Sequence, residues 1–244
     1  MHRFFAEPLP TDDSCFCLSP EDTKHALSVL RLKAGDPAEI ISGGNLWSAV
    51  ILSADHPQVV LRRLELLPSP EPSLSVTLYQ GLPKSDKMDW IVQKATELGV
   101  SRIVPVMTER CVVRFSASDA AHKLTRWRKI AREACKQSGR CVIPEITDPR
   151  RLSGLPSLLA EEDRVIVPWE EAAGFGPLAF RQSCPELSSL GIIIGPEGGI
   201  DREEMAYLRE QGCLPLTLGK RILRTETAGL AALSAIMSLY GEMD

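Results

Sequence analysis

The stretch Leu190-Gly191-Ile192-Ile193-Ile194-Gly195-Pro196-Glu197-Gly198-Gly199 decides the class of fold. Its first half is a short apolar run that ends at a glycine, which is typical of a strand buried in a parallel sheet. The glycines that follow predict a tight turn, and Asp201 with Glu204 forms the capping-box pattern that opens a helix. A buried strand, a glycine turn and a helix in succession indicate an α/β fold with a mostly parallel sheet.

The glycine turn is also the first candidate for a binding site. Glycines let a ligand approach the backbone closely, and free amide groups at a helix start favour an anionic or polar group. The turn does not match G-x-G-x-x-G, so neither a Rossmann dinucleotide site nor the usual glycine-rich methyltransferase loop is supported. No G-x-x-x-x-G-K-[ST] loop for ATP occurs either. A purely structural turn is the alternative, because tight turns also recruit glycine.

A second polar segment follows the last strand expected in the chain. It runs from Leu218 to Ala228, and its residues Arg224, Thr225, Glu226 and Thr227 stand between two apolar elements. They lie near the carboxyl end of a strand, where ligands of α/β sheets usually bind. The helix that follows is rich in small residues, which favours close packing against the sheet or against a second subunit.

The chain divides at a proline-rich linker, residues 67–73, because alternate prolines favour extended chain. Before it, short apolar runs around the turn Gly43-Gly44-Asn45 predict a small β-rich barrel over residues 1–70, with one helix at about 20–32. After it, residues 74–244 alternate strands with helices. The strands are expected at 75–80, 102–106, 164–168, 190–194 and 214–218, and the helices at about 86–98, 120–137, 202–211 and 226–240.

Charge separates a basic middle of the chain from its acidic ends. The net charge is −4, yet residues 81–151 carry 15 basic and 8 acidic side chains. The helix expected near 120–138 has a cationic face opposite the apolar residues Leu124, Trp127, Ala131 and Ala134. A solvated amphipathic helix and a surface for RNA phosphates are equally good explanations of that face. A polyanion would be drawn here, because phosphate neutralisation depends on local charge.

Other residue types argue against several classes of protein. The seven cysteines include no C-x-x-C pair, which fits neither a disulfide framework nor a zinc site. The four histidines stand far apart, so metal catalysis is not expected. The amino terminus lacks the apolar core of a signal peptide, and no apolar stretch reaches membrane-spanning length. We therefore expect a cytoplasmic protein that binds neither metal nor membrane.

Motifs spread over nearly the whole chain occur in a specific order and spacing. They are Met1-His2-Arg3-Phe4-Phe5, His25 through Gly35-Asp36, Gly81 through Gly99, Thr108-Glu109-Arg110, Arg132-Glu133-Ala134 with Gln137-Ser138, Ile193 through Gly199, and Leu223 through Ala228. Together they resemble the RsmE family of ribosomal RNA uridine methyltransferases, within the SPOUT superfamily. The one departure from the family pattern is Cys111.

The resemblance implies an amino-terminal PUA-like β-barrel that binds RNA, a carboxy-terminal SPOUT domain knotted as a trefoil, and a homodimer. S-adenosylmethionine is the cofactor that it implies, bent within the knot. Its cradle would lie at the turn after Val167 and at the two segments described above. The implied cofactor-binding residues are Pro168, Gly195, Pro196, Glu197, Gly198, Gly199, Leu218, Gly219, Ile222, Leu223, Arg224, Thr225 and Thr227.

The activity that the resemblance implies is methylation of N3 of a uridine in 16S ribosomal RNA, either free or in the small ribosomal subunit. Uridine N3 must lose its proton, and a fixed guanidinium can stabilise the resulting anion. Arg224 is therefore the first catalytic candidate and Arg114 the second. Glu197 and Glu226 are candidates for the general base, with water as the alternative.

A base that leaves its stack needs compensating phosphate contacts. The candidate RNA-binding residues are Arg3, Arg31, Lys84, Lys87, Arg110, Arg126, Lys129, Arg132, Lys136 and Arg140. Two other functions stay open at this point. One is a SPOUT methyltransferase that acts on transfer RNA or on a ribose 2′-hydroxyl, and the other is an RNA-binding protein without catalysis.

Overall fold

A computed structural model of the chain describes residues 1–55, 57–112 and 117–243. The chain divides into two compact units, one of Met1–Glu71 with Cys135–Val142 and the other of Pro72–Ala134 with Ile143–Asp244. Each unit is built around hydrophobic clusters of its own. In the part of the chain that the structure describes, no helix is both long enough and apolar enough to cross a membrane.

The first unit contains a closed β-barrel with the strand order β1-β2-β5-β4-β3. Its inward residues alternate along the strands, as Phe4, Ile40, Ile51 and Leu61 do, and form one buried cluster. At the β3–β4 turn, Gly43 and Gly44 both have positive φ, 57° and 77°, which confirms the expected hairpin. The strands are β1 (His2–Leu9), β2 (Asp12–Leu18), β3 (Pro37–Ser42), β4 (Asn45–Asp55) and β5 (Gln58–Leu67).

The single helix expected at 20–32 is wrong in its second half. Helix α1 covers only Pro20–Lys24 and begins at Ser19, whose hydroxyl accepts a hydrogen bond from the amide of Asp22. The chain then widens into the π-helical turn η1 (His25–Val29). It leaves the helical path at Arg31, whose φ of 55° lies in the left-handed region.

The second unit is built on a parallel sheet with the order β12-β10-β11-β6-β7-β8, and β9 pairs with β7. From β6 the chain moves to β7 on one side, whereas β10 and β12 lie beyond β11 on the other. The carboxyl ends of β6 and β11 thus flank the point where the strand order reverses. The strands are β6 (Ser75–Gly81), β7 (Arg102–Met107), β8 (Glu145–Ile146), β9 (Arg150–Arg151), β10 (Arg164–Pro168), β11 (Ser189–Ile194) and β12 (Leu214–Leu216).

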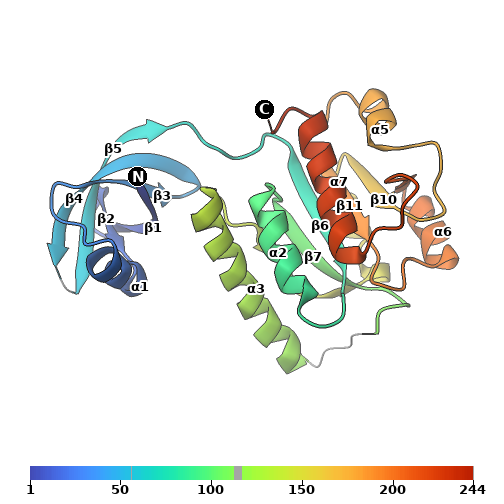
Figure 1. The fold of residues 1–244 in the computed structure, drawn as a ribbon, viewed down its shortest axis with the longest axis horizontal. Helices are drawn as coiled ribbons and strands as arrows, with labels where there is room; N and C mark the ends of the chain where they lie inside the picture. The colour runs from blue at the N-terminus through green and yellow to red at the C-terminus, as the bar shows by residue number, and fades with distance from the viewer. Residues whose placement is uncertain (56, 113–116, 244) are drawn as a thin grey trace. The chain divides into compact units, whose positions relative to one another are not determined.

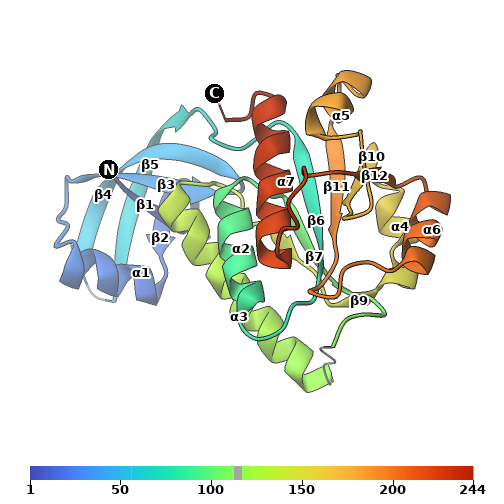
Figure 2. The ribbon, with the colours of Figure 1, turned by 45° about the vertical axis from the view of Figure 1, so that its right-hand side comes forward.

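Helices cover both faces of this sheet (Figure 1). Along β11, Ile192 and Ile194 enter the cluster on one face while Ile193 enters the cluster on the other, as the period of two in a strand requires. The first face is covered by α2 (Lys87–Glu97), α3 (Ala117–Ser138), α5 (Pro177–Ser183) and α7 (Thr225–Leu239), and the second by α4 (Pro156–Leu159) and α6 (Arg202–Glu210). Figure 2 shows α2 and α7 side by side.

The end of α3 and the loop after it belong to the barrel unit. Arg140 is only 5% exposed, and its Nη2 donates to Glu71 Oε2 at 2.6 Å. The other carboxylate oxygen of Glu71 accepts from the amide of Cys141 at 2.6 Å. Because its guanidinium is held in a buried ion pair, Arg140 does not offer the surface charge that the expected RNA contact requires.

Candidate active site

Three loops meet at the carboxyl edge of the parallel sheet, after β10, β11 and β12. Trp169 follows β10, and its backbone amide donates to Leu216 O at 3.0 Å in β12. The indole Nε1 of Trp169 donates to Ile200 O at 3.2 Å, directly after the glycine turn. The turn after Val167 and the turn after Ile194 are therefore joined by one hydrogen bond, although Trp169 and Ile200 lie 31 residues apart in the sequence.

Thr225 joins the arginine-bearing segment to the glycine turn. Its hydroxyl donates to Gly195 O at 2.6 Å and accepts from Gln80 Nε2 at 2.9 Å. Thr225 is 5% exposed and Gln80 is fully buried, so this relay is shielded from water. The amide oxygen of Gln80 has no hydrogen-bond partner among the described residues. The two carboxy-terminal segments that the sequence singles out are thus in direct contact inside one unit.

Glycines at this edge have no room for a side chain. A Cβ on Gly81 would lie 2.5 Å from Pro196 N and 2.8 Å from the carbonyl carbon of Gly195. A Cβ on Gly195 would lie 2.8 Å from the carbonyl carbon of Gly199. The end of β6 therefore packs directly against the glycine turn, which brings backbone groups of both segments together.

Lys87, Glu197 and Glu226 form a small charge cluster next to the Gln80–Thr225–Gly195 hydrogen bonds. Lys87 Nζ lies 3.0 Å from Glu197 Oε1 and 3.2 Å from Glu226 Oε2, and the backbone amide of Lys84 donates to Glu197 Oε1 at 3.1 Å. The two carboxylates, Glu197 first, raise the pKa of Lys87. Partial burial raises the pKa of Glu197, but Lys87 and the amide donors outweigh it and hold that pKa below its usual value. Glu197 is accordingly placed to stay ionised at neutral pH.

Arg224 is the N-cap residue of α7 and has an extended backbone, with φ −66° and ψ 154°. It is exposed, and its guanidinium makes no hydrogen bond or ion pair with any side chain that the structure describes. Ile222, two residues earlier, is 88% exposed, which leaves an apolar side chain uncovered beside the relay. Arg114, the second catalytic candidate, lies outside the described residues.

The cations expected to bind RNA fall into two groups. One group is already engaged: Arg3 with Glu39, Lys87 with Glu197, Arg110 with Gly198 O, Arg126 with Asp89, Lys136 with Asp22, and Arg140 with Glu71. The others, Arg31, Lys84, Lys129 and Arg132, are exposed, as are Arg110 and Arg126, and Arg132 is engaged as well. Lys129 lies on the outward face of α3, opposite the buried Trp127 and Ala131.

Two site residues were missed in the sequence. Gln80 is the one amide side chain in the apolar run of β6, and a polar residue at the end of a buried strand is the signal that points to it. Trp169 was passed over because nothing in its local pattern shows that its indole reaches Ile200. Among the described residues, no group of three or more His, Cys, Asp and Glu side chains is arranged to hold a metal ion.

Two models of known protein families match parts of the chain. Residues 70–237 match the model of an RNA methyltransferase domain, and residues 18–62 match the model of an RNA methyltransferase PUA domain.

Relatives of known name match over nearly their whole length. Ribosomal RNA small subunit methyltransferase E of Bacillus subtilis is 36% identical over 245 residues, which cover 97% of this chain and 96% of the relative. The protein of the same name from Aquifex aeolicus is 32% identical, with 98% and 100% covered. A solved structure of that enzyme from Neisseria gonorrhoeae, bound to S-adenosyl methionine, is 33% identical, with a TM-score of 0.84 over the full length of both chains. A Legionella pneumophila methyltransferase solved with the same cofactor is 34% identical, with a TM-score of 0.80 and 97% and 96% covered.

Proposed function

The chain belongs to the RNA methyltransferase family that includes ribosomal RNA small subunit methyltransferase E, and from this membership we propose that it methylates N3 of one uridine in 16S ribosomal RNA. It is an S-adenosylmethionine-dependent ribosomal RNA methyltransferase. The uridine and its N3 atom are the part of the proposal that goes beyond family membership.

One observation carries the proposed site: the Thr225 hydroxyl donates to Gly195 O while it accepts from Gln80 Nε2. This contact places the glycine turn, the end of β6 and the start of α7 around one point. A ligand bound at that point would meet the backbone of all three. An RNA-binding protein in which the glycine turn is merely structural would not need Gln80 to keep a buried amide oxygen without a partner.

S-adenosylmethionine supplies an electrophilic methyl group when it is bound. The residues present suit it, because the glycine turn presents backbone groups without side chains at Gly195, Gly198 and Gly199, and no described residue satisfies the buried Gln80 Oε1. The start of α7, a helix of 15 residues, offers backbone amides to a carboxylate. The proposed cradle is Pro168, Gly195, Pro196, Glu197, Gly198, Gly199, Leu218, Gly219, Ile222, Leu223, Arg224, Thr225 and Thr227.

Arg224 is the proposed catalytic residue. Its exposed guanidinium can donate two hydrogen bonds to a uracil carbonyl and so stabilise the negative charge that develops when N3 loses its proton. The proton has two possible acceptors nearby, Glu197 and Glu226, whose carboxylates share Lys87. Glu197 is the better acceptor to test first, because it is the more exposed of the two, 29% against 20% for their side chains.

The proposal assigns RNA binding to the barrel of residues 1–70 and to the exposed cations of α3, and cofactor binding and dimerisation to residues 74–244. Two features of the family complete it: a trefoil knot in the second unit and a homodimer. The passage of the chain from β12, at one edge of the sheet, to α7, which contacts β6 and β11 in its middle, is consistent with a knotted path. The reaction would take place in the cytoplasm, on the small ribosomal subunit or its RNA.

The test combines cofactor binding with identification of the product. Equilibrium dialysis should show saturable binding of S-adenosylmethionine, which an RNA-binding protein without catalysis would not show. Incubation with methyl-labelled cofactor and small subunits lacking the modification should then yield N3-methyluridine on nucleoside analysis. Label in a ribose methyl group, or label only when transfer RNA is the substrate, would overturn the proposed specificity.

The role of Arg224 is tested by Arg224→Ala. A preorganised charge of this kind is worth about 2.7–4 kcal/mol, so the single-turnover rate should fall by roughly a hundredfold or more. The affinity for S-adenosylmethionine should change much less. Lys220→Ala, in the same exposed segment, is the matched control and should leave the single-turnover rate close to that of the wild type.

A further inference from the structure

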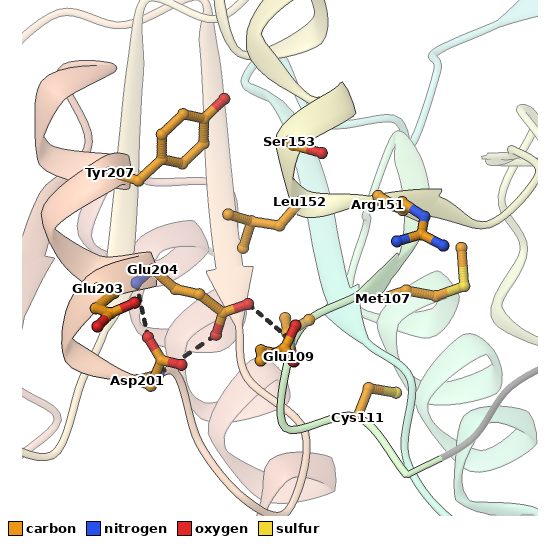
Figure 3. A pocket seen from close by; sticks show the side chains of 11 residues that line it. Met107, Glu109, Cys111, Arg151, Leu152, Ser153, Asp201, Glu203, Glu204 and Tyr207 are labelled. Carbon is orange, nitrogen blue, oxygen red and sulfur yellow. Dashed lines mark hydrogen bonds between the residues drawn. The ribbon is translucent and has the colours of Figure 1, made fainter.

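A pocket of about 700 Å³ lies in the second unit, on the α6 side of the glycine turn. Figure 3 shows its walls: the chain after β7 with Glu109, the short β9 segment with Arg151, and the first turns of α6 with Glu203 and Tyr207. None of these residues belongs to the proposed cofactor cradle. The pocket is nevertheless adjacent to it, because Arg110 Nη1 donates to Gly198 O at 3.0 Å.

The pocket contains a buried polar atom that lacks a partner. Thr108 lines the pocket and is only 8% exposed, and its Oγ1 has no hydrogen-bond partner in the part of the chain that the structure describes. A buried hydroxyl without a partner is uncommon in native proteins, so this hydroxyl is available to a group that enters the pocket. This atom can both donate and accept.

The carboxylates of the pocket divide into engaged and available groups. Asp201 and Glu204 cap α6, and Glu204 Oε1 also accepts from the amide of Glu109 at 2.7 Å. Glu109 and Glu203 carry no hydrogen bond or ion pair on their carboxylates among the described residues. In Figure 3 Glu203 lies on the α6 side and Glu109 on the chain after β7, with Asp201 and Glu204 between them, while Tyr207 and Arg151 stand on opposite sides of the pocket.

These features specify the chemistry of an occupant. The carboxylates of Glu109 and Glu203 accept hydrogen bonds from N–H groups and repel phosphate. They therefore suit the edge of a base that carries N–H donors. Guanine presents two adjacent donors, N1–H and N2–H, on its Watson–Crick edge, which match one carboxylate, and its O6 can accept from a hydroxyl. Tyr207 offers a ring for stacking, and Arg151 offers a cation to a phosphate on the other side.

We propose that this pocket binds a guanine nucleotide of the RNA substrate, distinct from the uridine that is methylated. The inference rests on the proposed function, because the guanine nucleotide belongs to the RNA that the enzyme is proposed to methylate. The nucleotide would lie on one side of the turn Thr108–Arg110 and the cofactor cradle on the other. A guanosine held there fixes the register of the RNA, so the uridine that reaches Arg224 is selected by its neighbour as well as by its own base.

The experiment uses the full chain with 13C-labelled methionine methyl groups. Met107 lines the pocket, so its methyl resonance, assigned through Met107→Leu, reports occupation. Titration with GMP should shift this resonance saturably, and UMP should shift it far less at equal concentration. Glu203→Gln and Thr108→Val should each weaken GMP binding, Glu203→Gln by about tenfold because hydrogen bonds to an ionised acceptor are lost. Glu210→Gln, at the exposed end of α6, should leave GMP binding unchanged.

The outcomes separate this inference from the proposed function, because cofactor binding and methyl transfer are measured on the same samples. Glu203→Gln should raise KM for the RNA about tenfold while kcat and S-adenosylmethionine affinity stay the same. The pocket assignment is overturned if the Met107 resonance does not respond to GMP, or if it responds equally to UMP and GMP. In that case intact methyl transfer leaves the enzyme assignment in place. A response to an arginine-containing peptide but not to GMP also overturns it, in favour of a protein partner. Absence of cofactor binding contradicts the proposed function instead.

Discussion

At the scale of single residues, Thr225 holds the site together. Replacing it with valine keeps the side-chain volume but leaves Gly195 O and one hydrogen bond of Gln80 unsatisfied in a buried place. Thr225→Val should therefore lower the free energy of unfolding by about 1–3 kcal/mol and weaken S-adenosylmethionine binding. Ser238→Ala, at an exposed position of the same helix, is the control for urea denaturation and equilibrium dialysis. Equal stability of the two variants would contradict the relay.

Lys87 gives the protein a pH dependence whose sign follows from its partners. The pKa of Glu197 is lowered, so its stabilising effect is present above its ordinary value of 4.5 and is lost as the pH falls through the lowered pKa. The pKa of Lys87 is raised above its ordinary value of 10.5, so the contribution of the pair is complete below 10.5 and is lost as the pH rises through the raised pKa. The difference in unfolding free energy between wild type and Lys87→Met should be largest between these limits.

The measurement is urea denaturation from pH 3 to pH 8 for both proteins. Lys94→Met serves as the control, because Lys94 pairs with Glu97 one turn away in the same helix and forms no ion pair with another element in the described part of the chain. A stability difference for Lys87→Met that stays constant down to pH 3 would mean that the Lys87–Glu197 pair does not stabilise the site.

At the scale of elements, the contact of β6 with the glycine turn is the tightest in the site. Gly81→Ala places a Cβ within 2.8 Å of backbone atoms of Gly195 and Pro196, so one element must move. Overpacking of this kind costs about 1–3 kcal/mol, and the displaced turn should bind S-adenosylmethionine more weakly. Gly154→Ala is the matched control, because nothing lies within 4 Å of its Cβ. Unchanged cofactor affinity in Gly81→Ala would show that the turn does not depend on β6.

Helix α3 carries the prediction about RNA. Lys129 is exposed on its outward face, and each phosphate contact contributes about 0.7–0.9 to the slope of log affinity against log salt. Lys129→Gln should reduce the magnitude of the slope by this amount in filter-binding measurements. Arg164→Gln removes one exposed charge at the start of β10, outside α3, and should leave the slope unchanged. Equal slopes for wild type and Lys129→Gln would remove α3 from the RNA surface.

Elements with strong periodicity were predictable from sequence, and irregular ones were not. The helix expected at 86–98 is Lys87–Glu97, and the strand expected at 190–194 is Ser189–Ile194. The stretch 20–32 fails because its helical spacing continues past the point where the backbone widens into a π-turn at His25. Short elements such as β8 and α4 were not expected, because two to four residues carry too little periodicity to be recognised.

At the scale of the whole molecule, the two segments that meet at the carboxyl edge of the sheet were recognisable in the sequence, but the contacts between them were not. The glycine turn and the segment before α7 were both recognised, since glycines and polar residues interrupt apolar runs there. Thr225 contacts Gly195 across 30 positions of sequence and Gln80 across 145, and local patterns reveal neither contact. Arg140 shows the same limit, because a basic residue in a basic stretch gives no sign that Glu71 buries it.

The central claim is that the glycine turn and the Arg224 segment together form a site that methylates uridine N3 in 16S ribosomal RNA. The most direct measurement is nucleoside mass spectrometry of this RNA from a strain that lacks the gene, complemented with the wild-type chain or with Arg224→Ala. N3-methyluridine should be absent from the deletion strain, restored by the wild-type chain and at most weakly restored by the variant. N3-methyluridine at wild-type level in the deletion strain, or no recovery on complementation with the wild-type chain, would contradict the account.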